Sequence, residues 1–231
     1  MSQAKKSQSS SPKASPPQQR GMPSEVRMLL LIGIPILLAG IVFALLTSRN
    51  QTPAGALDDT RLIRPDSPVS GAADAPVTIV EFLDPECESC RAAHPAIKEL
   101  LQTYTGRVRL VVRYFPLHTN SVLAALATEA AGEQDKYWEM QDLLFTRQPE
   151  WGENSVETPE VFTAYAQMLG LDIARFQDAM ANPIYRDKIE RDRQDGQALD
   201  VSGTPTFFVN GQLVEPLSYD RLVEMIEAAL G

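Results

Sequence analysis

The sequence predicts an α/β fold that follows a separate apolar segment near the N-terminus. Three observations lead to this prediction: an uncharged apolar run of 21 residues, a strand pattern that passes directly into a helix pattern, and an Asn-Gly pair between two short apolar runs near the C-terminus. The first is long enough to cross a bilayer, the second begins a βαβ unit, and the third is typical of a β-hairpin.

The N-terminal part of the chain divides into three segments. Residues 1–27 are rich in Ser, Gln, Pro and Lys and are expected to form a disordered cytoplasmic tail. Residues 28–48 carry no charge and would span roughly 31 Å as a helix, so they are predicted to be a single transmembrane anchor. A cleaved signal peptide is the alternative, but its apolar region is normally shorter. Residues 49–73, with several Pro and Gly, are expected to be a linker.

The charges that flank the apolar run predict its orientation. Five Lys and Arg residues precede it and three follow it closely, which places the tail in the cytoplasm. We therefore expect a single-pass protein of a bacterial-type inner or cell membrane, with its main domain in the periplasm or a similar extracytoplasmic space. Disulfide chemistry belongs in that compartment.

The acidic character of the main domain argues against nucleic-acid binding. The formal net charge is -9, and the residues after 49 hold 15 basic and 29 acidic side chains. Such a domain repels phosphate backbones.

The remaining sequence shows a βαβ unit, a helical block and a hairpin followed by a helix. Residues 77–83 are predicted to form a buried strand interrupted by Glu81, and strand 108–115 follows a helix that begins near Cys87. Apolar spacing predicts helices over 121–131, 134–146, 159–169, 173–181 and 183–199. The Asn-Gly hairpin joins 206–209 to 212–214, and a final helix covers 217–230. The alternating charges of residues 186–193 are interpreted as a solvent-exposed helix face.

Cys87 and Cys90 are the only cysteines, and they lie where the strand pattern gives way to a helix. The start of a helix offers unpaired backbone N–H groups and the positive end of the dipole, and both favour a thiolate. Cys90, one turn further on, can attack a mixed disulfide formed on Cys87. The pair is therefore predicted to be a redox-active disulfide with Cys87 as the accessible nucleophile.

Other uses of the two cysteines are less consistent with the sequence. A structural disulfide across so small a loop would stabilise little, and a zinc site needs two further ligands. His94 and His118 are the only histidines, and both are interpreted as structural. A Cu(I)-binding or metal-delivery module remains the alternative, because soft thiolates suit Cu(I), and a non-redox chaperone is a third hypothesis. The favoured interpretation requires no metal and no cofactor.

Three motifs resemble those of the DsbA-like thiol-disulfide oxidoreductases of the thioredoxin superfamily. They are EFLDPECESC at 81–90, VSGTPTFFVNG at 201–211 and a softer helical run at 129–139. The resemblance covers about residues 66–231. It implies a thioredoxin fold over residues 74–231 with a helical insertion at about 119–200, and an enzyme that exchanges disulfides with protein substrates.

The resemblance also implies a role for each site residue. Cys87 would attack, Cys90 would resolve the mixed disulfide, and Glu81 would be a buried carboxyl that relays the Cys90 proton. Pro205 would be in cis beside the disulfide, and the Thr204 backbone would pair with an extended substrate. The expected partners are proteins with thiols or disulfides; a membrane redox partner is left open, and a monomer is expected.

The dipeptide between the cysteines departs from the family pattern. It is Glu88-Ser89, whereas strongly oxidising members carry Pro-His. With Asp84 and Glu86 also close by, like charges are expected to leave the pKa of Cys87 only mildly depressed. The direction of the chemistry, oxidation or reduction and isomerisation, is therefore left open.

Overall fold

The structure, a computed structural model, describes residues 60–152 and 158–231. The predicted tail at 1–27 and the predicted anchor at 28–48 lie outside the described residues. Within the two described ranges, no helix combines the length and the apolar character that a bilayer crossing requires.

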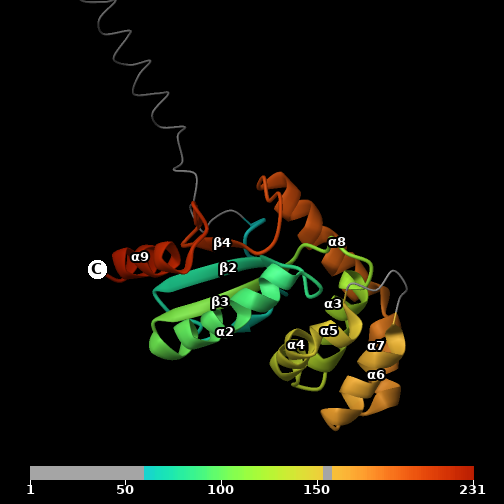
Figure 1. Ribbon diagram of the computed structural model, residues 1–231. Coiled ribbons are helices and arrows are strands. Elements are labelled where there is room, and N and C mark those ends of the chain that lie inside the picture. Colours follow the sequence, from blue (N-terminus) through green and yellow to red (C-terminus); the bar gives the residue numbers. More distant parts are fainter. Residues whose placement is uncertain (1–59, 153–157) are drawn as a thin grey trace, which may run out of the picture. The chain divides into compact units, whose positions relative to one another are not determined.

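A five-stranded mixed sheet forms the centre of the domain, with the strand order β1-β3-β2-β4-β5 (Figure 1). β2 and β3 are parallel, and the other neighbouring strands pair antiparallel. All seven residues of β2 are buried, Glu81 included, as the prediction of a buried strand requires. The strands are β1 (Val69–Ser70), β2 (Val77–Leu83), β3 (Val108–Tyr114), β4 (Thr206–Val209) and β5 (Gln212–Leu213).

Helices cover the sheet and form the insertion. α2 (Glu88–Thr103) connects β2 to β3, which confirms the βαβ unit, and α9 (Tyr219–Leu230) contacts β2 and β4. The predicted helical block is confirmed, with bounds shifted by up to three residues. It comprises α3 (Ser121–Gly132), α4 (Tyr137–Thr146), α5 (Gln148–Trp151), α6 (Pro159–Met168), α7 (Ile173–Ala181) and α8 (Pro183–Ala198). α5 was not predicted, because four residues are too few to show a helical period.

Alternation along β2 divides the core into two faces. Ile79 and Leu83 pack with apolar residues of α2 and α9, whereas Val80 and Phe82 pack on the opposite face. Glu81 shares the face of Ile79 and Leu83, because side chains two residues apart in a strand point the same way. This places its carboxyl under α2. The insertion has a third cluster of its own, built from α3, α4, α5, α6 and α7.

Parts of residues 60–73 pack on the domain, so the described end of the segment predicted as a linker, 49–73, is not a free linker. Leu62 is only 2% exposed and packs in the cluster of Val80, Phe82 and Val111. β1 adds an edge strand beside β3. We call residues 60–70 the N-terminal strap. It escaped prediction because two paired residues between Pro68 and Gly71 show no alternation.

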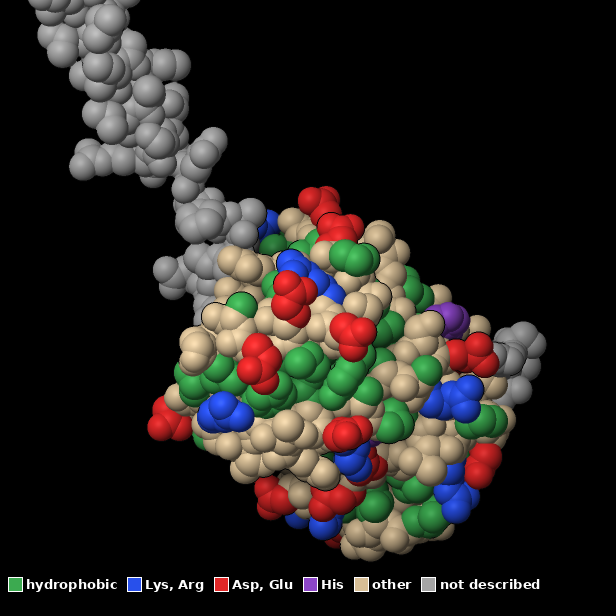
Figure 2. All heavy atoms as spheres, turned by 60° about the vertical axis from the view of Figure 1, so that its left-hand side comes forward, with side chains coloured by type: hydrophobic (Ala, Val, Ile, Leu, Met, Phe, Trp, Pro, Cys, Tyr) green, Lys and Arg blue, Asp and Glu red, His purple; other side chains and the backbone are tan. Residues whose placement is uncertain are grey.

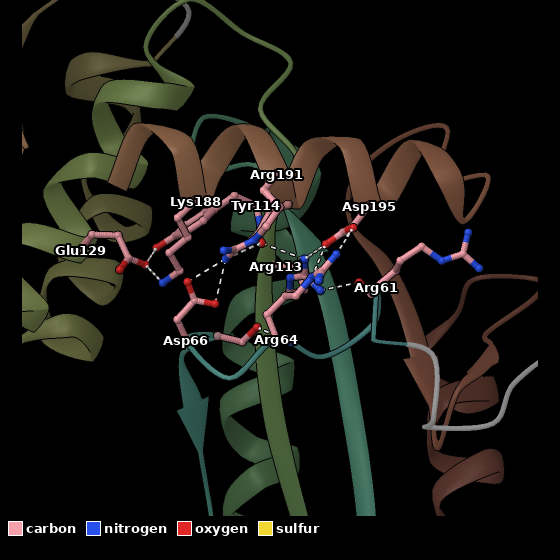
Figure 3. A network of polar contacts seen from close by, with 11 residues as sticks. Arg61, Arg64, Asp66, Arg113, Tyr114, Glu129, Lys188, Arg191 and Asp195 are labelled. Atoms are coloured by element: carbon pink, nitrogen blue, oxygen red, sulfur yellow. Dashed lines mark hydrogen bonds and ion pairs between the residues drawn. The ribbon is translucent and has the colours of Figure 1, made fainter. Parts of the chain in front are cut away.

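A network of ion pairs ties the strap to β3 and α8 (Figure 3). Arg113 of β3 is fully buried and donates to Asp192 at 2.7 Å and to Asp195 at 2.6 Å, both in α8. It also donates to the backbone oxygen of Arg61. Arg64 of the strap donates to both carboxylate oxygens of Asp195, at 2.8 and 2.6 Å. Three segments that are distant in sequence are therefore joined by charge-assisted hydrogen bonds.

The solvent-exposed face predicted for residues 186–193 is wrong for two of its charged residues. Lys188 is 5% exposed and Asp192 is fully buried. Lys188 donates to Glu129 of α3 at 2.5 Å, and Glu129 also accepts a hydrogen bond from Tyr114 at 2.8 Å. The partners that neutralise these charges come from other elements, which the charge pattern of one helix cannot reveal.

Candidate active site

The two cysteines lie at the start of α2, directly after the turn that leaves β2. We call residues 84–87 the catalytic turn. Cys87 is the N-cap residue of α2, with φ -71° and ψ 125°, and its backbone N–H donates to the oxygen of Asp84 at 3.1 Å. Cys87 is partly exposed and Cys90 is fully buried; both are free thiols. Only Cys87 of the pair is therefore open to a protein substrate.

The surroundings of Cys87 favour its thiolate. A hydrogen bond from the Cys90 thiol lowers the pKa of Cys87 most, and the nearby Thr204 hydroxyl and hydrogen bonds from the backbone N–H groups of Cys90 and Ser89 lower it further. Burial opposes these effects, and the resulting pKa is about 5. The sulfur of an N-cap residue is well placed to accept from the first turn of its helix. The expectation of a mildly depressed pKa is therefore wrong.

The nearby carboxylates do not act as free charges on Cys87, because the turn and the helical insertion supply their partners. Asp84 is fully buried and accepts from the backbone N–H groups of Glu86 and Leu117, each at 2.8 Å. Glu86 is 3% exposed and accepts from the Asn120 backbone N–H at 2.5 Å. The sequence argument counted these formal charges without the groups that compensate them.

His118 brings an imidazole to the catalytic turn from the loop after β3. Its Nδ1 lies 2.6 Å from Asp84 Oδ2, and its side chain is 47% exposed. Burial lowers the pKa of His118, but Asp84, Glu86 and the charge of Cys87 together raise it above its ordinary value. The structural interpretation of His118 was therefore incomplete, because this residue also interacts electrostatically with Cys87.

His94 has the packing role that the sequence indicated. Its Nε2 lies 2.6 Å from Asp142 of α4, and its ring stacks at 4.8 Å, between centroids, on Phe145. Burial lowers the pKa of His94 more than Asp142 raises it.

Cys90 and Glu81 form the buried half of the site. Burial raises the pKa of Cys90, and the hydrogen bond with Cys87 and the charge of Glu81 raise it further. Glu81 is 5% exposed, and burial raises its pKa to about 8. At neutral pH this carboxyl can hold a proton and can also release one. The burial of Glu81 is thus confirmed, while its part in proton transfer stays a prediction.

The Thr204-Pro205 loop lies against Cys87. The Thr204–Pro205 peptide bond is cis, as the family resemblance implied, and so is Glu215–Pro216. The Cys87 thiol donates to the Thr204 backbone oxygen at 3.3 Å. The Thr204 hydroxyl is buried and makes no regular hydrogen bond within the described residues. This hydroxyl favours the thiolate form of Cys87 and so lowers the pKa of Cys87.

An apolar groove runs beside the pair. It has a volume of about 310 Å³ and lies between the exposed face of α2, Pro205 and the start of α9. Leu217 and Tyr219 are about half exposed at its rim. Apolar side chains also gather in a band across the face shown in Figure 2, with acidic and basic side chains around them. Such a surface suits an extended peptide with apolar side chains.

Gln148 of α5 contacts the catalytic turn and was missed by the sequence analysis. It is 3% exposed, and its Nε2 donates to the backbone oxygens of Pro85 at 2.8 Å and Cys87 at 3.1 Å. No local signal marks a Gln in a helical stretch as a neighbour of residues some sixty positions away. For metal binding, the described residues contain no group of three or more His, Cys, Asp or Glu placed to hold an ion.

A family model described as Thioredoxin matches residues 64–228. The chain belongs to the Thioredoxin family. Among solved structures of similar fold, BdbD from Bacillus subtilis in its oxidised form is 30% identical, with a TM-score of 0.64 over 71% of this chain and 92% of that one. A thioredoxin-like oxidoreductase from Silicibacter pomeroyi is 30% identical, with a TM-score of 0.65 over 75% and 98%. These matches establish a thioredoxin-like α/β fold with helices on a mixed sheet.

The curated relatives are larger proteins. The Na(+)/H(+) antiporter NhaA 3 of Salinispora tropica is 44% identical over 147 residues, which are 62% of this thioredoxin-family chain and 22% of the antiporter. NhaA of Herminiimonas arsenicoxydans is 37% identical over 152 residues, 66% of this chain and 23% of that protein. The chain thus spans only 22% and 23% of the length of these two relatives.

Proposed function

We propose that the chain is a thiol-disulfide oxidoreductase that exchanges disulfides with protein substrates through Cys87 and Cys90. One observation carries the proposal: the partly exposed Cys87 caps α2 against the Thr204–cis-Pro205 loop, while Cys90 and Glu81 are buried behind it. A pKa of about 5 for Cys87 makes it a good leaving group and favours oxidation of the substrate.

In the proposed cycle a substrate thiolate attacks the Cys87 sulfur of the Cys87–Cys90 disulfide. The bond between the two cysteines breaks, and Cys90 leaves as a thiolate that takes a proton, with Glu81 as the buried carboxyl whose charge acts on Cys90. A second substrate thiolate then attacks the substrate sulfur of the mixed disulfide. Cys87 leaves as a stabilised thiolate, the substrate gains a disulfide, and its two electrons reside on the reduced pair. A disulfide-bearing partner must then reoxidise the pair.

Substrate binding is proposed at the Thr204 backbone and the adjacent groove. The Thr204 carbonyl already serves as a hydrogen-bond acceptor beside Cys87, and an extended peptide can replace the thiol there. Main-chain pairing supplies affinity with little sequence preference, which suits an enzyme for many protein substrates.

We further propose that residues 28–48 anchor a monomer in the cell membrane with the domain outside the cytoplasm. The uncharged run and its basic N-terminal flank support this topology. The names of the curated relatives, Na(+)/H(+) antiporters, also support a place beside a membrane for a domain of this kind.

Exchange with a reduced protein that carries two thiols tests the proposal. The oxidised full-length chain should form one substrate disulfide per Cys87–Cys90 disulfide consumed. Cys87→Ser should abolish the reaction. Cys90→Ser, mixed instead with a protein that carries a disulfide, should accumulate a mixed disulfide through Cys87, because no Cys90 thiolate is present to resolve it. Tight binding of Cu(I) by a pair that exchanges no disulfide would replace this function with metal delivery.

A further inference from the structure

The helical insertion and the loop that leads into it hold the catalytic turn through residues outside the thioredoxin-like strands. The N–H groups of Leu117 and Asn120, which precede α3, donate to the carboxylates of Asp84 and Glu86. Gln148 of α5 donates to the backbone of the turn itself. The turn that presents Cys87 is therefore fixed from the insertion as well as from β2 and α2.

Gln148 differs from the other contacts because it binds peptide carbonyls. One amide nitrogen donates to the oxygens of Pro85 and Cys87, which lie on the two sides of Glu86. The Cys87 oxygen also accepts the first backbone hydrogen bond of α2, from the Arg91 N–H at 3.1 Å. Gln148 thus fixes the peptide plane at which the turn ends and the helix begins.

The orientation of this peptide plane decides where the Cys87 sulfur lies relative to the helix. An N-cap side chain reaches the N–H groups of the first turn only when its backbone is extended, as the ψ of 125° at Cys87 is. The N–H groups in question belong to Ser89 and Cys90. A rotation of the Cys87 carbonyl would turn these donors away from the sulfur.

We propose that Gln148 is a positioning residue for disulfide exchange, which from the helical insertion fixes the catalytic turn and aims the Cys87 sulfur at the start of α2. This inference rests on the proposed function, since it concerns the reactivity of the same pair. It gives the insertion a role in the chemistry in addition to any role in substrate binding.

Replacing the neutral Gln148 should leave the charged groups around Cys87 in place. Asp84 and Glu86 keep their buried partners, Glu88 is exposed beside Arg91, and His118 stays on Asp84. A change in the Cys87 thiolate fraction on substitution of the neutral Gln148 therefore reports the geometry of the turn.

The test uses the reduced full-length chain and three variants. Gln148→Met keeps the size of the side chain but removes the donor. Gln148→Asn keeps the amide with a shorter reach. Gln134→Met is the matched control, because the Gln134 amide also binds backbone groups, those of Asp172 at 3.1 and 2.9 Å, but within the insertion. The pH dependence of Cys87 alkylation by iodoacetamide gives the thiolate pKa of each protein.

Gln148→Met should raise the Cys87 pKa by about one unit, which is about a tenfold loss of thiolate at low pH, and Gln148→Asn should raise it less. Gln134→Met should titrate like the wild type. A wild-type titration in folded Gln148→Met would overturn the inference, as would the same shift in the Gln134→Met control. If Gln148→Met does not fold, an unshifted Gln148→Asn overturns it and a shifted one supports it. Failure of the wild-type chain to exchange disulfides would instead overturn the proposed function.

Discussion

The sulfur of Cys87 lies 3.3 Å from the backbone oxygen of Thr204, the residue that precedes cis-Pro205. These two residues are 117 positions apart in the sequence, and the fold brings them together because β4 pairs with β2. The attacking sulfur therefore lies directly beside the backbone that is proposed to bind the substrate. A substrate strand paired there would present its own sulfur to Cys87.

The Cys87 thiolate should stabilise the reduced protein relative to the oxidised one. Because folding lowers the pKa of Cys87 to about 5, this stabilisation is full above the ordinary thiol pKa and is lost as the pH falls through 5. We expect the reduced form to unfold at a higher urea concentration than the oxidised form at pH 7, with the difference shrinking towards pH 5. A more stable oxidised form at pH 7 would indicate a reductant instead.

Glu81→Gln should remove a pH-dependent destabilisation of the fold. Because burial raises the Glu81 pKa to about 8, the folded protein keeps a proton that the unfolded chain loses above the ordinary carboxyl pKa. Wild-type stability should therefore fall by up to about 1.4 kcal/mol per pH unit from there to pH 8. Urea unfolding of both proteins at pH 5 and pH 8 checks this, and the variant should gain stability relative to wild type at pH 8 only.

The same substitution should slow the step in which Cys90 gives up its proton. Positioned proton transfer is worth roughly a hundredfold or more in rate. The reverse of the first step, in which Cys90 attacks the mixed disulfide and releases a substrate with a single thiol, should therefore slow in Glu81→Gln when it is followed at pH 7. An unchanged rate would show that Glu81 takes no part in the proton transfer, and that its burial only destabilises the fold.

The order of elements and the cysteine site could be predicted because their signals are local. The composition of residues 77–83 is enough to indicate a strand, and Asn210-Gly211 is enough to indicate a turn. Cys87 and Cys90 lie one turn apart at the start of one helix. None of these features depends on a residue elsewhere in the chain.

The electrostatics of the site could not be predicted, because they depend on partners that only the fold supplies. From the sequence alone, Asp84 and Glu86 are two negative charges that would repel the Cys87 thiolate. The fold supplies their hydrogen-bonding partners, which are Leu117, His118 and Asn120. The same holds for the charges of α8 and for Leu62, whose burial needs a sheet face that its neighbours in sequence do not provide.

His118→Ala should raise the pKa of Cys87 by less than one unit. The imidazole is half exposed, so its attraction for the thiolate is partly screened, and the shift should be larger at low salt. His94→Ala is the matched control, since His94 also pairs with an aspartate at 2.6 Å but lies against α4. Iodoacetamide titration at two salt concentrations measures both variants, and equal shifts would point to a general loss of packing.

Arg113→Met should destabilise the domain strongly. It leaves the buried carboxylate of Asp192 without its close guanidinium and removes one of the two guanidinium groups that bind Asp195, which costs about 3–5 kcal/mol. Arg193→Ala removes an exposed pair with Glu190 on the same helix and should cost at most about 1 kcal/mol. Urea unfolding at pH 7 compares the two, and equal losses would show that the buried network adds nothing beyond a surface pair.

The N-terminal strap should be required for a stable domain, whereas the residues before it should not. A protein shortened to residues 49–231, which lacks the predicted anchor, should be soluble and active, and one shortened to 60–231 should match it. A protein that begins at residue 74, where the sequence alone placed the domain start, loses Leu62, Arg64 and β1.

That loss uncovers the apolar face of Val80 and Phe82 and removes one partner of Asp195. Burial of Leu62 alone is worth about 1.5–3 kcal/mol, so the shortest protein should unfold at a clearly lower urea concentration or aggregate. Equal unfolding midpoints for the proteins that begin at 60 and 74 would show that the strap adds no stability and behaves as part of the linker. A lower midpoint with an unchanged Cys87 alkylation profile would show that the strap supports the sheet and leaves the catalytic turn as it is.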